Sequence, residues 1–318
     1  MNSRMNAAFF EEYGEPDVVQ SDTLPKPEPG EGEVLVRVKS AGVNPVDTAI
    51  VRGFLKEMIP AELPAVPGWD LAGTVEETGF AAHRFKPGDE VYAYARRPII
   101  GQGTFAEYVT IPESYLALRP QNISMEEVGG IPLVGLTAYQ SLFDAGNLQH
   151  GQMILILGAS GGVGTFAIQL AKTKGVEVIG VASEKNHNYM KELGADHTID
   201  YSDNHVGEAV SAIAPGGVNF IYDCSRGDAF GQVMESGALK EGGKIVSITK
   251  SKPDISEDID FSYVFVEPNA RQLELISELA DAGSIRVPVT KSYSLDDVPE
   301  ALKAIEKLHT RGKIVVTP

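Results

Sequence analysis

The residues best suited to chemistry in this chain form a glycine-rich turn between an apolar run, 153–157, and a segment with helical apolar spacing. The turn contains Ala159, Ser160, Gly161, Gly162, Val163 and Gly164. A strand, a glycine turn and a helix in this order bring backbone N–H groups and a helix N-terminus against a pyrophosphate. The alternative, a turn that only packs a helix onto a sheet, fits this context less well. We therefore predict a dinucleotide site, with Ala159 replacing the first glycine of the usual pattern.

The residues that end the next predicted strand, 177–181, select between NADH and NADPH. An acidic residue there would bind the ribose 2′-hydroxyl. This chain instead has Ser183 at that position, followed by Glu184 and Lys185. A hydroxyl beside an ammonium suits a 2′-phosphate, so these residues favour NADPH. NADH stays open because a shift of one residue would bring Glu184 to the ribose, and Lys185 by itself is equally consistent with a solvated surface residue.

The patterning of the chain predicts an α/β protein with two domains. Short alternating strands broken by turns predict a partly open antiparallel β-barrel in residues 1–123, to which the tail, 267–318, returns. Residues 124–266 begin with a predicted helical stretch, 124–143, and then alternate strands with helices. This alternation is typical of a Rossmann domain, a doubly wound parallel sheet.

Composition excludes several classes of function. A net charge of −17 argues against nucleic acid or an anionic membrane as a partner. The single cysteine, Cys224, excludes an internal disulfide and a four-cysteine zinc site, and its apolar surroundings predict an inert buried thiol. No apolar run approaches the length of a membrane span, and the N-terminus lacks the apolar core of a signal peptide. We expect a cytoplasmic protein.

Motifs spread over nearly the whole chain add a resemblance to these inferences. The motifs are Ala41–Asp47 (AGVNPVD), Arg52–Gly53, Pro67–Gly73 (PGWDLAG), Phe85–Val91 (FKPGDEV), Gly103–Tyr108 (GTFAEY), Gly135–Tyr139 (GLTAY), Leu193–Asp196 (LGAD), Ile199–Tyr201 (IDY) and Gly312–Val315 (GKIV). In order and spacing the chain resembles the zinc-independent medium-chain dehydrogenase/reductases of the quinone oxidoreductase and enone reductase branch. The resemblance implies a GroES-like catalytic domain, an active site in the cleft between it and the Rossmann domain, and a homodimer or a larger even assembly.

The same resemblance implies a metal-free reaction. Zinc-dependent relatives have a cysteine at the position of Asn44 and a His-Glu pair at Trp69 and Asp70, and this chain has neither. Without a Lewis acid, the acceptor of hydride must already be electrophilic, which a quinone or an α,β-unsaturated carbonyl is. The resemblance places Asn44 and Thr137 beside the nicotinamide and the acceptor, where Asn44 donates to the developing oxyanion. The alternative for Asn44 is an Asx turn before Pro45.

Further site residues are expected, some from the resemblance and some, such as Ser247, from their place at the end of a predicted strand. Asp47 is expected to support a neighbour or cap a turn rather than act as an acid. Among the cofactor residues, Tyr201 packs on the ribose phosphate or is a surface tyrosine, and Ser247 makes a backbone contact. Arg311 and Lys313 either reach the cofactor or do not, with equal weight.

The substrate pocket is expected to be mostly apolar. Its predicted residues are Arg52, Phe54, Trp69, Tyr94 and Phe265. Arg52 is equally consistent with an ion pair, and the segment 263–266 with an edge strand between subunits. Leu55 stands where enoyl-thioester reductases of the family carry a proton-donating tyrosine, so a fatty-acyl thioester substrate is disfavoured and water is expected to supply the proton.

These observations predict an NADPH-dependent reductase of quinones or activated C=C bonds that uses no metal. The alternative is a non-catalytic NADPH-binding protein, a crystallin-like or regulatory relative, whose cofactor motif would look the same.

Overall fold

The computed structural model describes residues 3–203, 205–307 and 311–318, which divide into two compact units. The first unit extends to Leu136 and also contains Glu267–Gly283 and Val287–Pro318. The second contains Thr137–Val266 and Ser284–Arg286. This division differs from the predicted boundary after residue 123, because 124–136 packs with the first unit: Ser40 Oγ donates to the Glu126 carbonyl, and Leu133 N–H donates to Asp70.

The first unit is built on a mainly antiparallel sheet. Its strands are β3 (Glu33–Gly42), β4 (Asp70–Thr78), β5 (Glu90–Tyr94), β6 (Tyr108–Pro112), β7 (Ala117–Leu118), β14 (Val289–Tyr293) and β15 (Lys313–Val316). The order is β14-β15-β3-β4-β5-β7, and β6 pairs with β3. A separate antiparallel pair joins β1 (Arg4–Phe9) to β2 (Gln20–Pro25). This arrangement confirms the predicted GroES-like fold.

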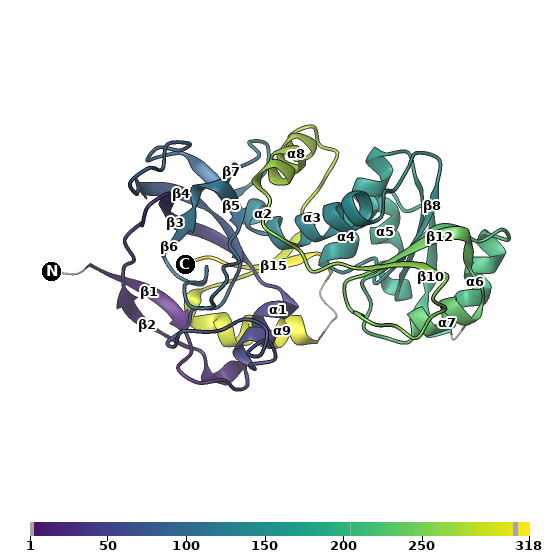
Figure 1. The fold of residues 1–318 in the computed structure, drawn as a ribbon, viewed down its shortest axis with the longest axis horizontal. Helices are drawn as coiled ribbons and strands as arrows, with labels where there is room; N and C mark the ends of the chain where they lie inside the picture. The colour runs from purple at the N-terminus through teal and green to yellow at the C-terminus, as the bar shows by residue number, and fades with distance from the viewer. Residues whose placement is uncertain (1–2, 204, 308–310) are drawn as a thin grey trace. The chain divides into compact units, whose positions relative to one another are not determined.

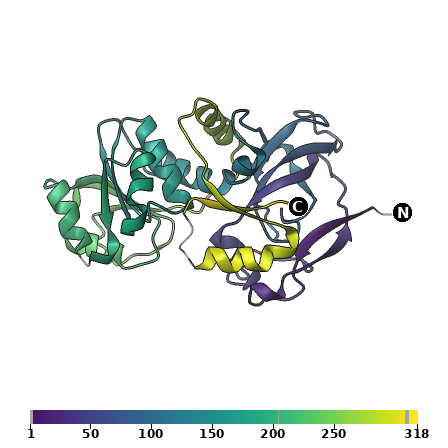
Figure 2. The same ribbon diagram turned by 180° about the vertical axis from the view of Figure 1, so that it is seen from behind.

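The C-terminal segment completes the first unit. β15 pairs antiparallel with β3, with Val315 opposite Gly42. The yellow helix α9 (Val298–Glu306) lies beside α1 (Pro45–Val51), as Figures 1 and 2 both show. The unit also contains α2 (Met125–Gly129), α8 (Ala270–Asp281) and the 3₁₀ turns η1 (Pro16–Val18), η2 (Glu113–Tyr115) and η6 (Leu295–Asp297). Residues at opposite ends of the chain therefore share one unit.

The helical stretch predicted over 124–143 is helical in the structure but is divided into separate pieces. The segment forms α2, α3 (Pro132–Tyr139) and a π-helical turn, η3 (Gln140–Ala145). The interruption has a local cause: Gly129 and Gly130 end α2, and Pro132 has no N–H to continue the ladder but fits the first turn of α3.

The second unit contains a parallel sheet of the order β10-β9-β8-β11-β12-β13. Its strands are β8 (Met153–Leu157), β9 (Glu177–Ala182), β10 (His197–Asp200), β11 (Val218–Asp223), β12 (Leu239–Ser247) and β13 (Asp260–Tyr263). Its helices are α4 (Gly162–Thr173), α5 (His187–Glu192), α6 (Val206–Ile213) and α7 (Ala229–Glu235), with 3₁₀ turns η4 (Glu184–Asn186) and η5 (Tyr201–Asp203). This is the strand order of a dinucleotide-binding Rossmann sheet, as predicted.

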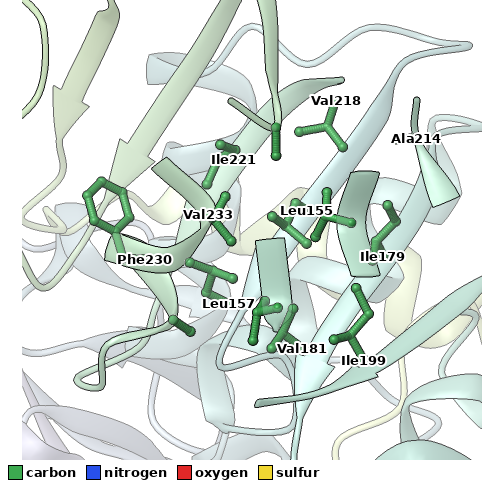
Figure 3. Packing of buried hydrophobic residues seen from close by; sticks show 14 of the residues in the cluster. Leu155, Leu157, Ile179, Val181, Ile199, Ala214, Val218, Ile221, Phe230 and Val233 are labelled. Carbon is green, nitrogen blue, oxygen red and sulfur yellow. The ribbon is translucent and has the colours of Figure 1, made fainter. Parts of the chain in front are cut away.

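The sheet of the second unit is buried on both faces. Leu155 and Leu157 of β8 belong to one apolar cluster together with Ile179 and Val181 of β9 (Figure 3). The alternate residues Ile154 and Ile156 are also buried but lie outside this cluster, on the other face. Each such side chain contributes about 1.5–3 kcal/mol on burial. The carboxyl ends of these strands are consequently held by a rigid core.

Candidate cofactor and active site

The glycine turn leads directly from β8 into α4. Gly161 is the N-cap of α4, and no side chain caps it, so the first-turn N–H groups are available to an anion. A Cβ at Gly164 would lie 2.5 Å from the Gly158 carbonyl oxygen, so that position requires glycine for the helix to pack against the turn. The turn therefore fits the pyrophosphate of a dinucleotide cofactor.

The turn lies at the point where the strand order reverses. β8 pairs with β9 on one side and with β11 on the other. Gly158 has a φ of +79°, and a Cβ there would lie 3.0 Å from the carbonyl oxygen of Cys224, which follows β11. Ligands of open parallel sheets bind outside the strands at this reversal. Cys224 is half-buried, and burial raises the pKa of its thiol well above the usual value.

Ser247 ends β12 at the same edge of the sheet, but its side-chain hydroxyl is already hydrogen-bonded within the protein. Its hydroxyl donates to Asp223 Oδ2 over 3.0 Å, and the same oxygen accepts from Lys250 Nζ over 2.9 Å. Ser247 and Asp223 are both fully buried. The predicted role of Ser247 in cofactor binding does not involve a free hydroxyl.

The predicted 2′-phosphate residues lie at the end of β9. Ser183 is half-buried, Lys185 is exposed, and Tyr201 is 48% exposed. Sequence reasoning missed Asn186, whose Nδ2 lies 3.1 Å from Ser160 Oγ and 3.2 Å from Ser183 Oγ. Its amide joins the glycine turn to the end of β9. The sequence could have pointed to Asn186, because it lies three residues after Ser183 and one 3₁₀ turn brings the two side chains together.

Asn44 lies in a buried polar cluster of the first unit, at the N-cap of α1. Its Nδ2 donates to Asp70 Oδ2 over 2.9 Å and to the Gly42 carbonyl over 3.3 Å. Its Oδ1 accepts from Lys313 Nζ over 2.6 Å. Its backbone N–H donates to Asp47 Oδ2 over 2.7 Å, so Asp47 closes a capping box.

Burial controls the ionisation of this cluster. It raises the pKa of Asp47 to about 8, so Asp47 is mostly neutral at pH 7, and its Oδ1 has no hydrogen-bond partner. Burial also raises the pKa of Asp70, although Lys313 and Asn44 oppose that rise. Asp70 and Lys313 are less than 4% exposed. They form an ion pair of 3.4 Å, which balances one buried charge with another.

This geometry corrects the donor role predicted for Asn44 and decides between the alternatives for Lys313. Both N–H groups of the Asn44 amide are engaged, so Asn44 has no free donor for an oxyanion. Of the two alternatives for Lys313, the geometry favours the one without a cofactor contact, because its Nζ already has three acceptors within the first unit: Val43 O at 3.2 Å, Asn44 Oδ1 and Asp70 Oδ2. The reason is that β15 pairs with β3 and so carries Lys313 into the core. Arg311 is exposed.

Thr137 and the predicted pocket residues are not equally accessible. Thr137 is 4% exposed, and its carbonyl accepts from Tyr222 Oη over 3.4 Å. Trp69 and Tyr94 are buried and pack edge to face. They belong to the core rather than to an open surface. Phe265 is half-buried.

The remaining pocket residues lie at the surface of the first unit. Phe54 is 70% exposed, so its ring is free to contact an apolar ligand. Arg52 pairs with Glu15 and Glu306, which resolves its two alternatives in favour of the ion pair. Arg52 is therefore removed from the predicted pocket.

Within the residues that the structure describes, no group of three or more His, Cys, Asp or Glu side chains is arranged to hold a metal ion. Among the same residues, no helix combines the length and apolarity that crossing a membrane requires.

Comparison with known proteins agrees with the fold. Residues 30–121 match the alcohol dehydrogenase GroES-like domain, and residues 193–316 match the zinc-binding dehydrogenase family. The chain is 30% identical over 331 residues to a chloroplast envelope quinone oxidoreductase homolog of Arabidopsis thaliana, covering 99% of this chain and 98% of that protein. It is 32% identical over 324 residues to an NADPH-dependent alkenal/one oxidoreductase of the same plant, covering 99% and 80%.

A solved structure gives the same result. The quinone oxidoreductase from Coxiella burnetii superposes with a TM-score of 0.87 at 30% identity, covering 99% of this chain and all of that one. The chain belongs to the medium-chain dehydrogenase/reductase family, in the branch of the quinone and enone oxidoreductases. It is an oxidoreductase of this kind, and its family binds a nicotinamide cofactor.

Proposed function

We propose that the protein is an NADPH-dependent, metal-free reductase of quinones or α,β-unsaturated carbonyls that acts by direct hydride transfer. The observation that carries the proposal is the joining of the glycine turn to the end of β9, where Ser183 and Lys185 replace the acidic residue of NADH sites. The names of the quinone and alkenal/one oxidoreductases above support the class of acceptor.

The Asn44 cluster supports a reaction without metal. The ammonium of Lys313 lies 2.6 Å from Asn44 Oδ1 and 3.4 Å from Asp70 Oδ2. A cation therefore already occupies the space between the side chains that align with metal ligands in zinc-dependent relatives. A second cation would be repelled by Lys313, and neither an amide nor a tryptophan is a good zinc ligand.

The residues of the chain have distinct roles in this function. The turn binds the pyrophosphate through backbone N–H groups, and Ser183 with Lys185 binds the 2′-phosphate. When bound, the nicotinamide supplies the hydride. The Asn44 cluster keeps the start of α1 fixed, and because its donors are engaged, the proton that completes the reduction comes from water.

The test uses purified protein treated with EDTA and then desalted. We expect it to oxidise NADPH with 3-penten-2-one or 1,4-benzoquinone, and to give 2-pentanone from the enone. Zinc addition should leave the rate unchanged. Turnover that appears only after zinc is restored would contradict the metal-free reaction, and equal kcat/KM with NADH would contradict the cofactor preference.

One observation favours a second function. The amide of Asn44 and the ammonium of Lys313 are satisfied within the first unit, which leaves no donor from this cluster for catalysis. A non-catalytic NADPH-binding protein would have no need of such a donor. Tight NADPH binding, measured by its fluorescence, together with no turnover of either acceptor, would establish this second function.

A further inference from the structure

The amide of Asn186 contacts two serine hydroxyls that belong to different parts of the cofactor unit. Its Nδ2 lies 3.1 Å from Ser160 Oγ and 3.2 Å from Ser183 Oγ. An amide nitrogen carries two hydrogens and accepts nothing. Each serine oxygen therefore accepts one hydrogen bond from Asn186, and each hydroxyl keeps its own hydrogen for another acceptor.

The two hydroxyls belong to the two segments that are predicted to bind the phosphates of the cofactor. Ser160 lies in the turn before α4, and Ser183 follows β9 and precedes η4. Both serines and Asn186 are half-buried, so these contacts are partly shielded from water. Hydrogen bonds from hydroxyls to an ionised phosphate are stronger than those between neutral groups.

Negative charges lie near these residues, so a 2′-phosphate needs hydrogen-bond donors that point toward it. Lys185 is cationic, but Glu184 is exposed beside it and Asp200 ends the neighbouring strand β10. The Ser202 and Glu184 backbone N–H groups donate to the carboxylate of Asp200, and these bonds lower its pKa, so it stays ionised at neutral pH. The charges at the end of β9 and β10 are therefore not positive in sum, and a 2′-phosphate needs hydrogen-bond donors in addition to Lys185.

We propose that Asn186 is a positioning residue that selects NADPH over NADH, because it directs the hydroxyl hydrogens of Ser160 and Ser183 toward the 2′-phosphate. The inference rests on the NADPH preference of the proposed function and adds the residue that sets it. A carboxylate in place of the amide would reverse the arrangement: it would accept from both hydroxyls and turn their hydrogens inward.

The test measures binding of adenosine 2′,5′-bisphosphate and of adenosine 5′-monophosphate by calorimetry, which needs no turnover. For Asn186→Asp we expect binding of the bisphosphate to weaken by about 30-fold and that of the monophosphate by less than about 3-fold, since a charged hydrogen bond is worth roughly 1.5–3 kcal/mol. Asn186→Ala should lose less, because the free hydroxyls can still rotate toward a phosphate.

Asn188→Asp is the matched control, because it adds the same charge two residues further on, at an exposed position. For Asn188→Asp we expect a small loss of binding for both ligands.

Equal losses of binding in Asn186→Asp and Asn188→Asp would overturn the proposal, because they would show a general electrostatic effect of the added charge. Equal loss of both ligands in Asn186→Ala, with an unchanged melting temperature, would overturn it in favour of a structural role. If Asn186→Asp does not fold, the ratio of the two affinities in Asn186→Ala decides. If the wild-type protein turns over neither acceptor but still binds the bisphosphate more tightly than the monophosphate, the reductase proposal fails and the role of Asn186 stands.

Discussion

The ammonium of Lys313 lies 2.6 Å from the amide oxygen of Asn44, across 269 residues of sequence. Lys313 has only donors and therefore fixes which end of the amide faces it, and Asp70 takes the other end. This three-residue arrangement ties the last strand of the chain to the N-terminus of α1.

Replacing Lys313 with methionine should strongly destabilise the first unit. The change leaves the carboxylate of Asp70 and the oxygen of Asn44 buried without their cation, which costs about 3–5 kcal/mol. Urea unfolding would measure the loss. The double variant Lys313→Met/Asp70→Asn should recover part of it, because no uncompensated charge remains. Lys303→Met, which breaks the exposed pair with Asp17, is the control and should have little effect. Similar losses in the two single variants would contradict a special role for the buried pair.

The neutral state of Asp47 predicts a pH dependence of stability. Its pKa is raised from 3.8 to about 8 in the folded chain, so between these values the unfolded chain binds fewer protons. The free energy of unfolding should therefore fall as pH rises through this window, and level off above about 8. Asp47→Asn cannot ionise, so its stability relative to wild type should rise by about 4 kcal/mol between pH 5 and pH 8. A difference between the two proteins that is constant with pH would show that Asp47 ionises normally.

Two glycines of the cofactor turn should respond differently to alanine. A Cβ at Gly164 would lie 2.5 Å from the Gly158 oxygen, whereas one at Gly161 would lie 3.4 Å from it. Gly164→Ala should destabilise the protein by about 1–3 kcal/mol. Gly161→Ala should keep the melting temperature but weaken NADPH binding, since its methyl group adds bulk where the cofactor approaches. The interpretation fails if Gly161→Ala is the less stable of the two.

The charge of Lys185 provides a test of cofactor preference by kinetics. Lys185→Glu should raise the KM for NADPH at least tenfold and leave the KM for NADH within about threefold, because only NADPH carries the 2′-phosphate. Lys191→Glu makes the same charge change six residues further along the chain, in the last turn of α5, and serves as the control. An unchanged KM for NADPH would mean that Lys185 is a solvated surface residue.

Several features of this protein were determined by local sequence. The apolar run 153–157, the glycines after it and the helical spacing beyond them act within about 20 residues, so the turn and the parallel sheet were predictable. The same is true of Ser183, whose position follows from the length of β9. The helical character of 124–143 was also predictable, and its break at Pro132 has a local cause, the two glycines and the proline.

The tertiary structure alone decided what the polar residues do. Asn44 was predicted as a donor to substrate, yet its amide is engaged by Asp70 and Lys313, which the pairing of β15 with β3 brings to it. Trp69 and Tyr94 looked suited to a pocket and are core residues instead. Hydrogen-bond partners and burial depend on which distant segments meet, and that information is not contained in the spacing of nearby residues.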